Sequence, residues 1–171
     1  MEFTHIKIGM VLALMAVLFG GSLGLGFGCC EHSIKTLLKE KAANVLTEKY
    51  EGKQELADKI IKKSWTYVKR SHFHSQTMGV IAIVFSLLVV WLKFPPQAQF
   101  GISLLSGLGS LGYGFFWLFS ALLAPGLGST GAAKEAVGLI AQGSAGSFYI
   151  ATLGLIGFLI HKMFIKPQTD A

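Results

Sequence analysis

Charge-free apolar windows alternate with polar stretches along this chain, and they predict four membrane-spanning helices. The window between Lys7 and Glu31 holds about 23 residues, and its only ionisable side chains are those of two cysteines. A helix of that length covers about 34 Å, which exceeds the roughly 30 Å of hydrocarbon in a bilayer. The windows give expected spans at about residues 8–30, 76–92, 98–123 and 147–161.

Prolines and glycines separate these windows. Pro95 and Pro96 end the second span, because proline cannot continue a helix and disfavours helical geometry in the residue before it. Pro125 ends the third span, and a glycine-rich linker then leads to a short helix at about 132–141. The third window also repeats small residues at a spacing that is typical of tightly packed helices in lipid. These residues are Ser103, Ser106, Gly107, Ser110 and Gly114.

The polar stretch between the first two spans has a helical period of its own. After Ser33, which can serve as an N-cap, apolar residues follow the pattern of an amphipathic helix until Glu51 and Gly52 interrupt it. A second amphipathic run then meets no helix breaker before Trp91. We therefore expect a charged helical hairpin at about 33–72, outside the bilayer, whose second helix continues into the second span.

Together these segments predict an all-α integral membrane protein in which residues 1–171 form a single membrane domain. The expected fold is a four-transmembrane-helix bundle with the charged hairpin between its first two helices. Composition agrees, because only 14% of the residues are charged, whereas soluble domains carry about a quarter. A signal peptide is the alternative for the first window, but its apolar region would be shorter and would end in a small-x-small cleavage site.

Lysine and arginine are divided unequally between the two ends of such a bundle. Of the 15 basic residues, 11 lie on the hairpin side. The side of the termini holds the other four, which are Lys7, Lys93, Lys162 and Lys166. The positive-inside rule therefore predicts a cytoplasmic hairpin. We expect a location in a bacterial inner membrane, with the lipid bilayer and, through residues 31–74, other membrane or peripheral protein subunits as partners, and no nucleic acid.

The apolar windows carry no Asp, Glu, Lys or Arg in their interiors, which argues against ion-coupled transport and proton pumping. Gly-x-Ser-x-Gly, His-Glu-x-x-His and Cys-x-x-Cys are all missing from the chain. The stretch from Gly126 to Lys134 is a poor phosphate loop, since Ala132 stands where the lysine must follow the last glycine. The sequence therefore does not indicate an enzyme, beyond a redox subunit.

Histidines gather at the two span ends next to the hairpin. His32 follows the first span, and His72 and His74 precede the second, so an up-down bundle brings them to the same end. Neutral imidazoles are good ligands of haem iron, copper and zinc. Because residues two apart do not share a helical face, we expect one of the pair, preferably His74, to join His32 as an axial ligand of a haem b.

Neighbouring residues fit this hypothesis. Gly24 and Gly28 would leave room beside a flat macrocycle, and Arg70 would pair with its propionates. This layout resembles that of small four-helix b-type cytochrome anchors. The resemblance implies electron transport, so a haem-binding redox subunit is the first functional hypothesis.

Several alternatives stay open. The histidines can simply sit in the polar interface with their tips in water. A metal site can combine His32 and His74, with Cys29 and Cys30 as alternative ligands. The chain can also be a non-catalytic accessory or scaffold subunit whose hairpin docks partner proteins. The adjacent cysteines are not expected to bond to each other, because the ring they would close is tight, and in the cytoplasm both should stay reduced.

Overall fold

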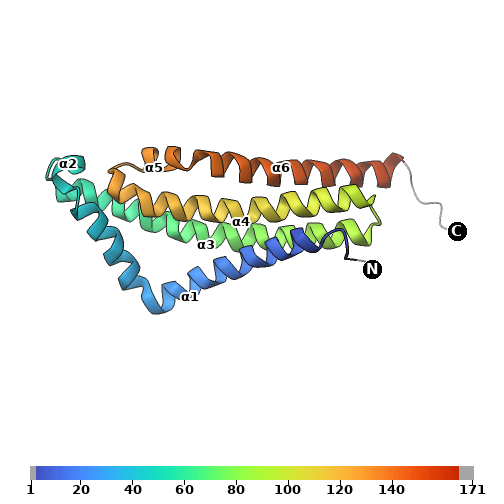
Figure 1. Cartoon of the computed structure of the whole chain (residues 1–171), viewed down its shortest axis with the longest axis horizontal. Helices are drawn as coiled ribbons and strands as arrows, with labels where there is room; N and C mark the ends of the chain where they lie inside the picture. The colour runs from blue at the N-terminus through green and yellow to red at the C-terminus, as the bar shows by residue number, and fades with distance from the viewer. Residues whose placement is uncertain (1–2, 166–171) are drawn as a thin grey trace.

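The structure, a computed structural model, describes residues 3–165, and every regular element among them is helical. Four of these helices are long and apolar enough to cross a bilayer, and they run in alternating directions along the molecule (Figure 1). The predicted all-α class and the four apolar helices are therefore confirmed. In chain order the elements are α1 (Lys7–Ala43), α2 (Leu46–Tyr50), α3 (Gln54–Trp91), α4 (Pro96–Leu127), α5 (Thr130–Ala136), α6 (Gly138–Ile160) and a π-helical turn (His161–Ile165).

Element boundaries follow the expected breakers with two differences. Pro96 stands in the first turn of α4, where a missing N–H costs nothing. Pro125, however, lies inside the last turn of α4, which ends at a left-handed glycine, Gly128. The short helix expected at about 132–141 is divided, because the backbone at Val137 leaves helical geometry (φ −116°, ψ 20°) and separates α5 from α6.

Small residues allow the long helices to approach closely. A Cβ added to Gly79 of α3 would lie 2.8 Å from the Val17 side chain and 3.0 Å from the carbonyl oxygen of Ala13, both on α1. A Cβ on Gly109 of α4 would lie 2.7 Å from the carbonyl oxygen of Ser144 on α6. Since lipid offers no hydrophobic drive between helices, such close backbone packing is what holds a bundle together.

Buried serines add hydrogen bonds to this packing. Ser71 of α3 donates to the carbonyl oxygen of Gly114 on α4 at 2.7 Å. Ser86 and Ser103 share a hydrogen bond of 2.7 Å between the same two helices, and Ser103 also donates to the carbonyl oxygen of Ile6. In a water-free interior each of these hydroxyls needs a partner. The serines therefore help to fix the register of α3 and α4.

The first helix bends where its apolar segment ends. The backbone at Cys30 is non-helical (φ −135°, ψ 18°), and beyond it α1 turns back toward the start of α3 (Figure 1). The returning segment, α2 and the beginning of α3 enclose a small core of Leu38, Ala42, Tyr50, Ala57 and Ile61. The Tyr50 hydroxyl donates to the carbonyl oxygen of Pro125 at 2.6 Å, which fixes this core to the end of α4.

Candidate functional site

His72 is the candidate residue with the most specific surroundings. It lies on α3, and its Nδ1 is 2.6 Å from the carbonyl oxygen of Gly20 on α1. A carbonyl oxygen can only accept, so Nδ1 carries the proton of this hydrogen bond, and in the neutral form of the ring Nε2 is the acceptor nitrogen. The ring of Phe27 meets the imidazole edge-on, with 5.4 Å between centroids. The hydrogen bond and the aromatic contact therefore fix the orientation of the His72 ring.

The glycines of α1 form the notch that holds this imidazole. A Cβ on Gly24 would lie 2.8 Å from Cε1 of His72, and a Cβ on Gly20 would lie 2.7 Å from the Gln76 side chain. We expected Gly24 to make room for a macrocycle, but the structure places the His72 ring there. A Cβ on Gly28 meets no atom within 4 Å, so that glycine faces open space.

His74 lies on the other side of α3, against α4. Its ring is 5.2 Å from that of Tyr113 and is stacked at 6.0 Å on Trp117, measured between centroids. The Arg70 guanidinium lies over the same tryptophan, 4.8 Å from its ring centre, and 5.6 Å from the ring of Tyr67. These cation–π contacts hold Arg70 beside His74.

His32 is placed apart from both. It is exposed and follows the bend at Cys30. The structure thus brings His72 to α1 and His74 to α4. Among the described residues, His32 makes no hydrogen bond or ring contact with either of them. Within residues 3–165 no group of three or more His, Cys, Asp or Glu side chains could hold a metal ion.

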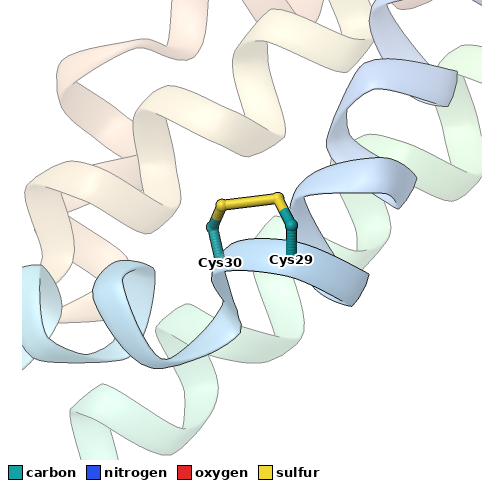
Figure 2. Close-up of a disulfide and its surroundings, with 2 residues drawn as sticks. All are labelled: Cys29 and Cys30. Atoms are coloured by element: carbon teal, nitrogen blue, oxygen red, sulfur yellow. A yellow bond between two sulfur atoms is a disulfide. The ribbon is translucent and has the colours of Figure 1, made fainter.

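Cys29 and Cys30 are joined by a disulfide in the structure (Figure 2). The expectation that two adjacent cysteines would not bond to each other was therefore wrong. The physical reason is the bend: a regular helix directs successive side chains about 100° apart, whereas the non-helical backbone at Cys30 lets the two sulfurs meet. Both residues are exposed, so the pair is accessible from outside the bundle.

Aromatic partners around these residues escaped the sequence reasoning. Phe27 packs edge-on against Trp65 at 5.3 Å, and the Lys35 ammonium lies 5.0 Å from the centre of the Trp65 ring. Trp117 is buried, and its indole Nε1 has no hydrogen-bond partner among the described residues. Apolar periodicity alone does not indicate which histidine each of these aromatic rings contacts.

Chemically, the arrangement offers one oriented imidazole acceptor, at His72, and one imidazole enclosed by aromatic rings and a guanidinium, at His74. Comparison with family models, with curated proteins and with solved structures gives no match for this chain. The case for a function therefore depends on the geometry of the chain itself.

Proposed function

We propose that this chain is a non-catalytic accessory or scaffold subunit, in which four apolar helices anchor a charged helical hairpin that docks partner proteins. The hairpin comprises the residues expected from the sequence, about 33–72. The observation that carries the proposal is the continuity of α3, which runs from the apolar bundle into the hairpin as one helix, whereas α1 enters the hairpin across a kink at Cys30. A surface built in this way has a fixed position relative to the bilayer.

Charge supports a position of the hairpin outside the hydrocarbon. Residues 31–70 hold 10 basic and 6 acidic side chains. Each charge at the bilayer centre would cost roughly 2.5–3.5 kcal/mol, so this segment belongs in water. Some charges pair locally, as Lys59 does with Glu55 at 2.8 Å. By the positive-inside rule, we further propose that the hairpin faces the cytoplasm of a bacterial inner membrane. In that reducing compartment the exposed Cys29–Cys30 pair would be held as two thiols and not as the disulfide of the structure.

The hairpin presents its free charges on a preorganised support. The hairpin is held in place by its core around Leu38 and Ala57 and by the hydrogen bond from Tyr50 to α4. Docking a partner therefore costs less conformational entropy than docking to a flexible segment would. Lys62, Lys63 and Lys69 are exposed on α3 and make no ion pair among the described residues. A partner with an acidic surface is therefore the best match, because complementary charge speeds encounter and fixes orientation.

Site-specific crosslinking tests this proposal. A photo-crosslinking residue at position 62 or 63 should yield a discrete protein adduct in native membranes, and its amount should fall at high salt. Thr77 is the matched control, since it is exposed on the same helix but within the apolar segment. No adduct at either hairpin position, or an equal adduct at position 77, would contradict docking through the hairpin.

A second function, a haem-binding redox subunit, is favoured by the hydrogen bond from His72 to Gly20. Metal-ligating histidines usually donate their other ring nitrogen in this way, and the bond leaves Nε2 free for iron. In this hypothesis His32 and one of the pair His72 and His74 are the two axial ligands of a haem b, and the hydrogen bond to Gly20 favours His72 within that pair.

Haem content distinguishes the two functions. Protein from haem-replete cells should show a Soret band if the redox hypothesis holds, and His72→Ala should reduce haem occupancy strongly. His5→Ala is the control, because His5 lies beside Lys93 and Phe94, at the end of the bundle opposite the hairpin. A colourless parent protein would reject the haem hypothesis and leave the scaffold function standing.

A further inference from the structure

The end of the bundle opposite the hairpin is cationic. Three segments meet there: the start of α1, the connection from α3 to α4, and the end of α6 (Figure 1). Within residues 3–30, 71–130 and 136–165 there is no Asp or Glu, so no acidic side chain of these segments offsets the charge. The basic and imidazole side chains at this end are His5, Lys7, Lys93, His161 and Lys162.

A cavity of about 260 Å³ opens among these cations. Lys93 adopts a left-handed backbone (φ 51°), which turns the chain sharply between α3 and α4. The Lys162 ammonium donates to the carbonyl oxygen of Leu92, so it caps the end of α3 from the π-helical turn that follows α6. Two cations are thereby set at the same opening. The cavity is lined by Lys93, Phe94, Pro95, Phe158, His161 and Lys162.

An apolar groove of about 480 Å³ lies next to this cavity on α6. It shares Phe158 and His161 with the cavity and passes over Gly154 and Gly157. These four residues recur at helical spacing, so they share one face of α6. A Cβ added to Gly157 would meet no atom within 4 Å. The missing side chain therefore leaves a channel on the surface of the bundle, at a helix that is apolar enough to contact lipid.

We propose that the cavity and the groove together form a binding site for one anionic phospholipid. The phosphate lies against Lys93, His161 and Lys162, and one acyl chain follows the glycine groove of α6. The combination carries the assignment: cations at a helix end attract an anionic headgroup, and the adjoining groove is apolar and lies on the outside of the bundle. A soluble phosphate would use the cations but not the groove.

Native mass spectrometry of the detergent-purified chain tests the site. The protein is incubated with equal amounts of phosphatidylglycerol and phosphatidylcholine that carry the same acyl chains. The parent chain should retain one phosphatidylglycerol in preference to phosphatidylcholine. Lys93→Gln should lower this preference roughly fivefold, as expected for one basic side chain near an anionic headgroup. Lys69→Gln, at the hairpin end, is the control for charge.

The groove is tested separately. Gly157→Leu should fill the channel and reduce retention of the lipid, and the open space at this position allows the fold to survive. Gly143→Leu is the control, because Gly143 is also on α6 and also faces open space. An unfolding curve for each variant verifies the fold.

Three results would overturn the proposal: equal retention of both lipids by the parent, an unchanged preference in the Lys93→Gln/His161→Gln double variant, or full displacement of phosphatidylglycerol by glycerol phosphate. The last result would assign the cations to a soluble phosphate. Loss of lipid in Gly157→Leu, with normal binding in Gly143→Leu, would support the groove.

Discussion

Replacing Gly107 by alanine should destabilise the bundle, because this glycine allows α4 to contact the backbone of α1. A Cβ at this position would press against the carbonyl oxygen of Gly9 and lie 3.1 Å from Cβ of Leu12 and 3.2 Å from the carbonyl carbon of Gly9. Favourable carbon contacts lie at about 3.5–4.0 Å. The neighbours are backbone or Cβ atoms that cannot rotate away, so the two helices would have to separate by a few tenths of an ångström or more.

The expected cost of Gly107→Ala is about 1–3 kcal/mol, the usual range for inserting a methyl group into a close-packed interface. For a chain of this size that corresponds to a fall of roughly 2–12 °C in the unfolding midpoint. Thermal unfolding in detergent measures it. The matched control is Gly101→Ala on the same helix, where an added Cβ meets nothing within 4 Å. If both variants unfolded at the parent's temperature, the assigned contact between α1 and α4 would be wrong.

The remaining predictions concern the hairpin core and the histidine notch. Tyr50→Phe should cost about 1–3 kcal/mol, because it leaves the buried carbonyl oxygen of Pro125 without its hydroxyl donor; the unfolding midpoint measures this. Burial raises the pKa of Tyr50 above 10.0, so its stabilisation is present below pH 10 and is lost as the pH rises through the raised value. Unfolding midpoints across this range should fall more steeply for the parent than for Tyr50→Phe. Gly24→Ala should displace the His72 ring and destabilise the chain by about 1 kcal/mol, whereas Gly28→Ala should not; nitrogen NMR of the imidazole would reveal any change of tautomer.

Long helices were predictable from the sequence because their determinants are local. No breaker lies between Lys53 and Trp91, and α3 is accordingly one helix from Gln54 to Trp91. The break in α1 at Cys30 lies close to the expected boundary between the first span, which was to end at about residue 30, and the hairpin, which was to begin at about 33. The direction of the bend was not predictable, because it depends on how Leu38 packs against the start of α3.

The candidate site was predictable only in part, because periodicity indicates shared faces and not the neighbours of each face. The two-residue spacing of His72 and His74 correctly separated them on α3. It could not indicate that α3 is flanked on both sides, so that His72 meets Gly20 of α1 while His74 meets Tyr113 of α4. Likewise, the glycines of α1 indicated an empty space, but only the helix register reveals that the imidazole of His72 occupies it.

The continuity of α3 has a thermodynamic consequence. It extends over 38 residues, or about 57 Å, from the hairpin to Leu92, whose carbonyl oxygen accepts the hydrogen bond from Lys162. Because α3 has no break along its length, a partner that displaces it at the hairpin would also displace the rim of the cavity at the far end. Any such coupling is reciprocal: a lipid bound beside Lys162 would alter the affinity of the hairpin for its partner by the same factor.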